Sequence, residues 1–272
     1  MKRKIYQQLL DWKHNRHGEV ALLIEGARRI GKSYIVEEFA KRNYKSYILI
    51  DFAFASEDVV NLFTTYSDNL DMLFMYLQEF YNTKLYERDT LFIFDEVQFC
   101  PKARSLIKQL VANGKYDYIE TGSLISIRKN VKDILIPSEE RKITMYPMDF
   151  EEFLWAIGNE TLMDFIKKCY NEKKPLTDLM HRKAMDYFKQ YLIVGGMPQV
   201  VLEYINSNDF SKVDKIKRDL LSLYRADIRK HSEDLSLKVE QIFDTIPSQL
   251  QKHEKKFNLS AMDENSISCI FI

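Results

Sequence analysis

Short apolar runs alternate with amphipathic stretches along the first half of the chain. Apolar runs bounded by polar or turn residues predict buried strands, and they cover residues 20–25, 46–52, 90–96, 116–121 and 142–146. Helical spacing of apolar positions is found over residues 4–12, after Gly31, over residues 57–82 with a break near Ser67, and from Pro101 to Asn113. Strands that alternate with helices predict an α/β domain with a parallel sheet covered on both faces.

The second half of the chain shows helical patterns only. They cover residues 149–157, 160–172, 177–193, 210–229 and 236–246, and the last is expected to end at Pro247. We therefore expect one domain over residues 1–150 and a helical segment over residues 151–272. The closing run MDENSISCIFI is either a last strand tucked into the core or the early end of a domain that is normally longer.

Composition changes this picture little. The chain of 272 residues carries 40 basic and 40 acidic side chains. This neutrality weakens the case for nucleic-acid binding but does not exclude a local basic face. Its three cysteines, Cys100, Cys169 and Cys269, lie far apart, which suits a reducing compartment. No run approaches the roughly 20 apolar residues that cross a bilayer, and no signal-peptide pattern is found. A cytoplasmic protein is expected.

The strongest chemical signal is the segment GARRIGKS, which matches the pattern G-x-x-x-x-G-K-S/T in full. Glycines let several N–H groups turn toward phosphate oxygens, and the helix that follows adds the positive end of its dipole. Lys32 is expected to reach the β- and γ-phosphates, and the Ser33 hydroxyl to ligate Mg²⁺. The segment predicts binding of a nucleoside triphosphate, first of all MgATP, by Gly26, Ala27, Arg28, Arg29, Ile30, Gly31, Lys32 and Ser33.

Two acidic residues, Asp95 and Glu96, end the apolar run LFIF. Ligand crevices of open parallel sheets lie at the carboxyl ends of the strands. Asp95 is therefore expected to hold Mg²⁺, directly or through water. Glu96 is expected to orient and polarise the attacking water. Surface acids often follow buried strands, so the acidic pair indicates a functional site only in combination with the phosphate loop.

Polar residues also end the fourth predicted strand, where Thr121 and Ser123 are candidates for sensing the γ-phosphate. A serine ahead of a helix is equally often an N-cap. Hydrolysis usually needs a cationic group on the γ-phosphate, from the same chain or another. Arg128 and Arg141 are the candidate arginine fingers beyond this strand, and Arg28 and Arg29 lie in the loop itself; each is otherwise a solvated surface charge.

Basic residues gather at two places in the second half. One reading is a nucleic-acid surface, and the other is the ordinary preference of basic side chains for helix C-termini; we favour the latter. The residues are Arg225, Arg229 and Lys230, and Lys252, Lys255 and Lys256.

Several stretches of the chain together carry a family resemblance, namely residues 26–33, 91–98, 120–126, 146–158, 191–201, 224–230, 246–250 and 255–258. They resemble the prokaryotic AAA-type ATP-binding proteins that often carry a C-terminal domain of unknown function. The resemblance implies an ATPase core of the additional-strand type, in which a strand separates the two Walker strands, Glu96 is the catalytic base and a sensor follows the fourth strand. It also implies a winged-helix-like helical segment, and a further domain resembling restriction endonucleases that this sequence ends without.

The leading hypothesis is an ATPase that hydrolyses MgATP to ADP and phosphate to drive or gate an interaction. The alternative is a nucleotide-gated DNA- or protein-binding module with little turnover. A further copy of the chain is also a candidate partner, and no membrane partner is expected. A small-molecule kinase would need an acceptor base and a charged lid, a GTPase an Asn-Lys-x-Asp motif, and an ABC-type ATPase an LSGGQ-like signature; the sequence shows none of these in recognisable form.

Overall fold

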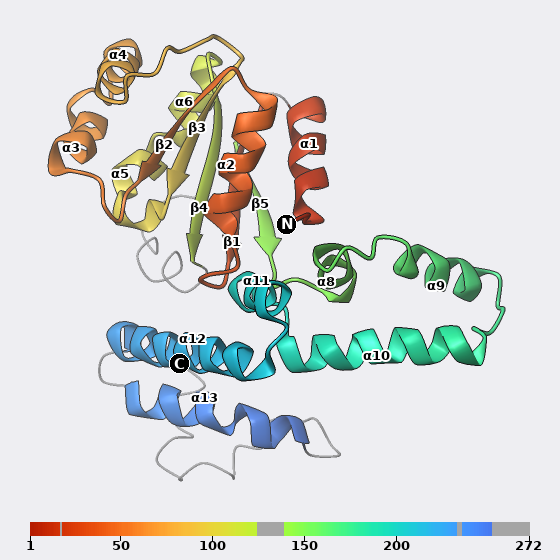
Figure 1. Ribbon diagram of the computed structural model, residues 1–272. Helices are drawn as coiled ribbons and strands as arrows, with labels where there is room; N and C mark the ends of the chain where they lie inside the picture. Colours follow the sequence, from red (N-terminus) through yellow and green to blue (C-terminus); the bar gives the residue numbers. More distant parts are fainter. Residues whose placement is uncertain (17, 124–138, 233–235, 252–272) are drawn as a thin grey trace. The chain divides into compact units, whose positions relative to one another are not determined.

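The protein is described by a computed structural model that covers residues 1–16, 18–123, 139–232 and 236–251 (Figure 1). The chain forms two compact units, Met1–Phe210 and Ser211–Ile272, and each is treated by itself. The boundary expected near residue 150 stays a prediction. None of the described helices combines the length and apolar character needed to cross a membrane.

A parallel sheet of five strands forms the centre of the first unit, in the order β2-β3-β4-β1-β5. Strand β4 therefore lies between β1, which leads into the phosphate loop, and β3, which ends in the acidic pair. The α/β fold and the additional-strand arrangement are confirmed. The strands are β1 (Ala21–Gly26), β2 (Ser46–Asp51), β3 (Thr90–Asp95), β4 (Asp117–Ser123) and β5 (Glu140–Met145).

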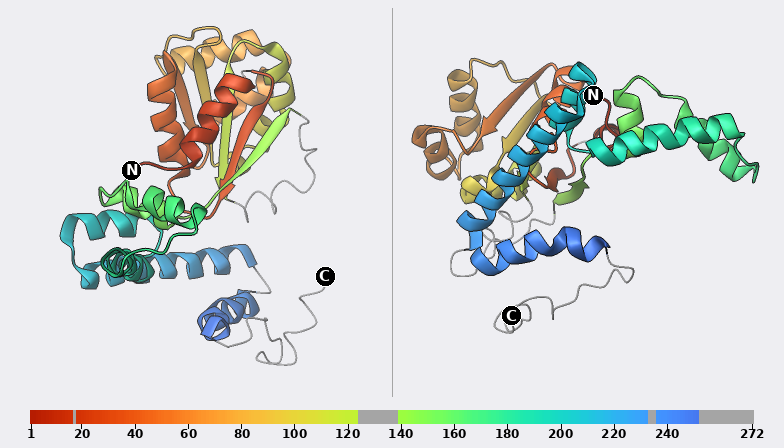
Figure 2. Two further views of the ribbon diagram at one scale, coloured as in Figure 1. Left: turned by 90° about the vertical axis from the view of Figure 1, so that its right-hand side faces the viewer. Right: turned by 60° about the horizontal axis from the view of Figure 1, so that its bottom comes forward.

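Helices cover both faces of this sheet (Figures 1 and 2), which explains why the inner strands β1 and β3 are mostly apolar and why β4 is buried along its whole length. Helices α1 (Ile5–Asn15) and α2 (Lys32–Asn43) pack on one face around Trp12 and Phe39. The other face carries an aromatic cluster with Phe63 and Phe94, whose ring centroids are 5.6 Å apart. It is covered by α3 (Glu57–Thr65), α4 (Leu70–Phe80), α5 (Pro101–Ser105) and α6 (Ile107–Asn113).

Local capping accounts for two of these boundaries. The break expected near Ser67 is present between α3 and α4, and the side chain of Asn69 accepts a hydrogen bond from Met72 N at 3.2 Å to start α4. Gly114, with a φ of 72°, ends α6 in the left-handed conformation that glycine favours. The single helix expected from Pro101 to Asn113 is divided at Leu106.

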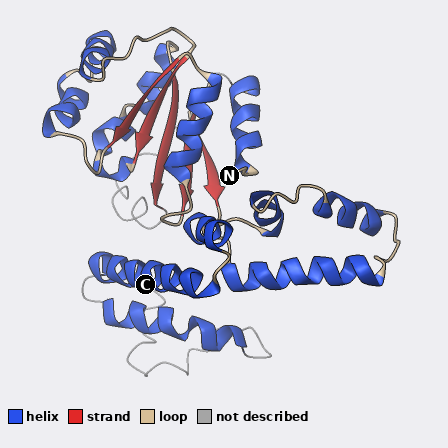
Figure 3. Cartoon of the chain, in the orientation of Figure 1, coloured by secondary structure: helices blue, strands red, loops and turns tan. Residues whose placement is uncertain are grey.

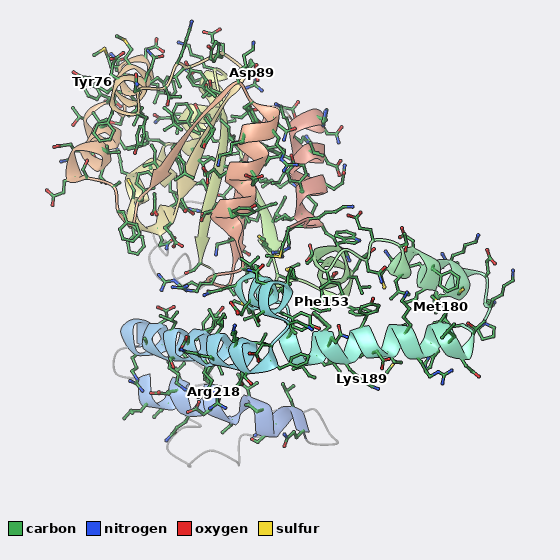
Figure 4. The ribbon with its side chains drawn as sticks, viewed as in Figure 1. Tyr76, Asp89, Phe153, Met180, Lys189 and Arg218 are labelled. Atoms are coloured by element: carbon green, nitrogen blue, oxygen red, sulfur yellow. The ribbon has the colours of Figure 1, made fainter. Side chains whose placement is uncertain are left out.

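Only helices follow β5 in the described residues (Figure 3). In the first unit, Phe153 lies on α8 (Figure 4). Its ring contacts Tyr191 and Tyr204, with centroids 5.5 and 6.2 Å away. Asp149 and Glu152 form a capping box at the start of this layer. Its helices are α8 (Phe150–Ala156), α9 (Leu162–Asn171), α10 (Asp178–Val194) and α11 (Pro198–Ser207). Helix α11 was not predicted, because its Gly-Gly-Met-Pro entry resembles a loop.

The second unit contains most of α12 (Phe210–Ser232) and α13 (Ser236–Gln251). Arg225 Nη2 lies 2.8 Å from Asp244 Oδ1, and Arg229 Nη2 lies 2.7 Å from Glu240 Oε1. The prediction that the last helix ends at Pro247 is wrong, because α13 continues through it to Gln251. A proline removes one N–H from a helix, and the following turn can still form. The helical expectation for this half is confirmed, and the strands of a wing are not among its described residues.

Candidate nucleotide-binding site

The sheet brings the predicted site residues to one edge. In register, Gly26 of β1 lies opposite Ser123 of β4, and Asp95 at the end of β3 lies beside β4 one residue beyond the Phe94–Glu120 pair. Because all five strands are parallel, their carboxyl ends share this edge. The loop that follows β1 therefore starts beside the polar ends of β3 and β4.

Two backbone features shape the loop. Gly31 adopts a left-handed conformation, with φ 88° and ψ 30°, and immediately precedes α2. A Cβ atom at Gly26 would lie only 2.3 Å from the carbonyl oxygen of Met145, so the loop leaves β1 in close contact with the end of β5. Glycine is needed at Gly26 for space and at Gly31 for backbone conformation. The N-terminus of α2 follows directly, as an anion site requires.

Lys32 is buried with its ammonium group inside the loop. Nζ donates to Gly26 O at 3.2 Å and to Ala27 O at 2.9 Å, and the residue is 6% exposed. Burial lowers the pKa of Lys32, while the charges of Glu96 and Asp95 raise it. A desolvated cation that is only partly compensated favours the arrival of an anion.

Asp95 and Thr121 form a buried pair across β3 and β4. The Thr121 hydroxyl donates to Asp95 Oδ1, and Asp95 and Thr121 are 6% and 0% exposed. Glu96 follows Asp95 in a left-handed conformation with φ 50°, which is uncommon for a residue other than glycine. The buried Gln98 amide donates to Glu96 Oε2. Gln98 was missed by the sequence analysis, which considered only the acids.

A third carboxylate at this edge, Asp51, was also missed. It ends β2 directly opposite Asp95, and its Oδ1 accepts a hydrogen bond from Ala53 N at 2.9 Å. Burial raises the pKa of Asp51, and the charge of Asp95 adds to this effect. The available signal was the pattern itself, since the run SYILID ends in an acid as LFIFD does.

The other candidates are placed differently. Ser123 is buried within β4 opposite Gly26, and Arg29 Nη1 donates to Gln199 Oε1 at 3.5 Å. Arg128 lies outside the described residues. Arg141 is not supported as an arginine finger for its own loop: it is opposite Leu22, four residues before Met145, which faces Gly26. At about 3.3 Å per residue this separates it from the loop edge by about 13 Å.

The basic residues Arg225 and Arg229 are engaged in the ion pairs described above, which supports the structural interpretation of this cluster. Lys252, Lys255 and Lys256 lie outside the described residues.

The segment Gly195–Pro198 lies against the phosphate loop, a contact that the phosphate-loop motif does not predict. A Cβ atom at Gly31 would be 3.9 Å from Pro198 Cγ. The backbone of Gly196 is fixed in turn, because Met148 N donates to Gly196 O at 2.7 Å and Tyr191 Oη donates to Met148 O at 2.9 Å. A cavity of about 740 Å³, lined in part by Tyr34 and Trp155, opens on the flank of α2 rather than over the loop itself.

Comparison with known proteins adds a family. The sequence model of the AAA domain family matches residues 19–154, and that of a domain of unknown function (DUF8612) matches residues 185–268. No curated protein matches the chain.

Three solved structures illustrate the likeness in fold. A Walker-type ATPase of Pyrococcus abyssi is 15% identical, over 91% of this chain and 77% of its own, with a TM-score of 0.45. The ADP complex of S. cerevisiae Hsp104 is 14% identical over 96% of this chain and 36% of its own, with a TM-score of 0.44. C. elegans PCH-2 is 11% identical over 76% of this chain and 60% of its own, with a TM-score of 0.37. Likenesses this distant carry no argument on function.

Proposed function

Because the chain belongs to the AAA domain family, we propose that it binds MgATP at Gly26–Ser33 and hydrolyses it to ADP and phosphate, to drive or gate an interaction. One observation carries the proposal. The loop with its buried Lys32 starts at the sheet edge where the Thr121 hydroxyl donates to Asp95. Phosphate-binding and metal-binding chemistry are therefore available side by side.

The phosphates would be held by the loop backbone, the N-terminus of α2 and Lys32. On binding, the Lys32 ammonium exchanges its hydrogen bonds to Gly26 O and Ala27 O for phosphate oxygens, which carry full charge. The negative charge of the phosphates would offset the cost of burial that lowers the pKa of Lys32. We assign the nucleoside part to the cavity beside α2, where Tyr34 and Trp155 offer aromatic faces.

The oxygen donors of the site fit Mg²⁺, which prefers hard ligands and is commonly held by one or two protein groups together with phosphates. Ser33 at the first turn of α2 and Asp95 would hold it, and Thr121 fixes the rotation of the Asp95 carboxylate. When bound, the ion neutralises charge that develops on the transferred phosphoryl group. Glu96, the next residue, would accept a proton from the attacking water.

The arginine finger would come from a second copy of the chain. Arg141 lies away from its own loop edge, and fingers supplied in trans are common in phosphoryl transfer. The sparse cysteines support a cytoplasmic setting for this activity.

A second function, a nucleotide-gated binding module with little turnover, is favoured by one contact. The Gln98 amide donates a hydrogen bond to Glu96 Oε2, and this restraint would slow proton transfer to Glu96. A protein partner suits this module better than DNA, because Arg225 and Arg229 are already paired, whereas Leu192 and Ile193 of α10 are 63% and 50% exposed.

Thermal unfolding with MgATP, MgADP or MgGTP, on wild type and Lys32→Ala, tests the proposed site. Ligand at about 100 times its dissociation constant stabilises by roughly 2.7 kcal/mol. At about 2–4 °C per kcal/mol for a chain of this size, the midpoint should rise by roughly 5–10 °C. A rise with MgATP that is lost in Lys32→Ala supports the site, and phosphate release then separates the two functions. The proposal is overturned if no nucleotide shifts the wild type.

A further inference from the structure

The guanidinium group of Arg3 joins three segments of the first unit that are far apart in sequence. Nη1 donates to Ile30 O at 2.9 Å, and Nη2 donates to Tyr146 O at 2.6 Å. Nε lies 3.2 Å from Glu152 Oε1. Arg3 is 7% exposed, so these contacts are shielded from water and are correspondingly strong. No sequence motif includes Arg3, and Arg3 precedes the residues that the family model matches.

The contact with Ile30 concerns the phosphate loop directly. The peptide between Ile30 and Gly31 is trans, as are all the described peptide bonds. In a planar trans peptide the C=O and the following N–H point in opposite directions. Arg3 therefore holds this peptide by its carbonyl, while the Gly31 N–H points away from the guanidinium. A positive charge on the carbonyl side also polarises the peptide and makes that N–H a stronger donor.

The opposite side of Arg3 is anchored by Glu152. Glu152 Oε1 accepts from Lys4 N at 2.6 Å, and Oε2 accepts from Asp149 N at 3.2 Å. The capping box fixes this carboxylate to the start of α8. The orientation of Arg3 is thus set by a buried counter-charge that is itself held at two oxygens. A lysine could supply the charge but not the fork that reaches two carbonyls and a carboxylate at once.

We propose that Arg3 is a positioning residue of the nucleotide site, which sets the orientation and donor strength of the Ile30–Gly31 peptide toward bound phosphate. This inference rests on the proposed function. The competing interpretation is a structural ion pair that only attaches the N-terminal segment to α8. If Arg3 positions the peptide, its substitution changes the Gly31 amide and nucleotide affinity, whereas an equally destabilising change elsewhere does not. If Arg3 has only a structural role, the two kinds of substitution have the same effect on nucleotide affinity.

The test compares Arg3→Lys with Leu77→Ala. Leu77 is buried in α4 on the other face of the sheet, so Leu77→Ala destabilises the protein by leaving a cavity away from the phosphate loop. Nucleotide affinity is measured with MgADP by calorimetry, at a temperature where each variant is folded. Arg3→Lys should weaken MgADP binding about tenfold or more, which is about 1.4 kcal/mol. Leu77→Ala should stay within about twofold of wild type.

A second readout needs no nucleotide. The amide proton of Gly31, followed by NMR in the free protein, should shift in Arg3→Lys and stay unchanged in Leu77→Ala. Glu152→Gln, which keeps Arg3 but removes its counter-charge and replaces one of the two acceptor oxygens by an NH2 group, should shift it in the same direction by less, and it replaces Arg3→Lys if that variant does not fold. An unchanged Gly31 amide, or equal loss of affinity in Leu77→Ala, overturns the inference. Failure of the wild type to bind any nucleotide counts against the proposed function instead, and the Gly31 amide still decides the role of Arg3.

Discussion

The hydroxyl of Thr121 donates a hydrogen bond to Oδ1 of Asp95, between the ends of two neighbouring strands, and both side chains are buried. The residue proposed from sequence as a γ-phosphate sensor is therefore attached to the residue proposed as a metal ligand. We therefore expect that a substitution of either residue alters the hydrogen bonding of the other. The two side chains form one buried hydrogen-bonded pair at the ends of β3 and β4.

Thr121→Val should weaken the magnesium-dependent part of nucleotide binding. The substitution keeps the shape of the side chain and leaves the buried Asp95 oxygen without its donor, and hydrogen bonds to charged groups contribute about 1.5–3 kcal/mol. Thermal unfolding with ADP over a range of Mg²⁺ concentrations measures the effect. Thr121→Ser keeps the hydroxyl and should behave as wild type; similar magnesium dependence in all three proteins would remove the proposed coupling.

Glu96→Gln should keep MgATP binding and lose turnover. The amide is close in size to the carboxylate but accepts no proton from water, and general bases contribute about 10²–10⁴-fold in rate. Phosphate release under saturating MgATP, with affinity measured in parallel, separates the two effects. Equal turnover in variant and wild type would contradict the assignment of Glu96. If the protein is instead a low-turnover module restrained by Gln98, Gln98→Leu should raise phosphate release.

Glu120→Gln should stabilise the protein at neutral pH. Glu120 is fully buried near Arg104, which lies 2.9 Å from Glu140 but 4.0 Å from Glu120. Burial raises the pKa of Glu120 well above its usual range; Arg104 and Lys142 oppose this, and Glu140 adds to it. A carboxyl group whose folded-state pKa is raised stabilises below its unfolded pKa, about 4.3, and that contribution is lost as pH rises through the folded value.

Denaturant unfolding at pH 5 and pH 8 checks this sign. The increase in the free energy of unfolding caused by Glu120→Gln should be larger at pH 8. At that pH the wild type must either bury a charged Glu120 or take up a proton on folding, and both lower its stability. Glu79→Gln, at an exposed position of α4, should change stability little at either pH. A variant that is less stable than wild type at pH 8 would show that a charged Glu120 is held by Arg104.

Gly196→Ala should cost more stability than Gly158→Ala. A Cβ atom at Gly196 would lie 2.0 Å from Met148 O, whereas at Gly158, with φ 83°, it would meet nothing within 4 Å. Strain alone in a left-handed conformation costs roughly 1–2 kcal/mol, so Gly158→Ala gives the reference. Because Pro198 lies beside Gly31, Gly196→Ala should also reduce the thermal shift caused by MgADP. Equal midpoints in denaturant for the two variants would contradict the clash.

Local patterns in the sequence determined the strands, most helices and the phosphate loop. Buried strands and helices carry their own periodicity, and a loop that binds phosphate needs glycines, a lysine and a hydroxyl at fixed spacing. The family resemblance supplied the additional-strand order, which the sheet confirms.

Only the tertiary structure decided which residues meet at the site. Asp51 opposite Asp95, Arg3 behind Ile30 and Pro198 beside Gly31 join positions far apart in sequence, and no periodicity encodes such pairings. Arg141 lies away from the phosphate loop for the same reason. Its distance from the loop is set by the register of β5 against β1, which its position in the sequence after β4 does not reveal. Sequence fixes what each segment can form by itself; long-range packing, in which distant side chains share one buried space, selects the neighbours.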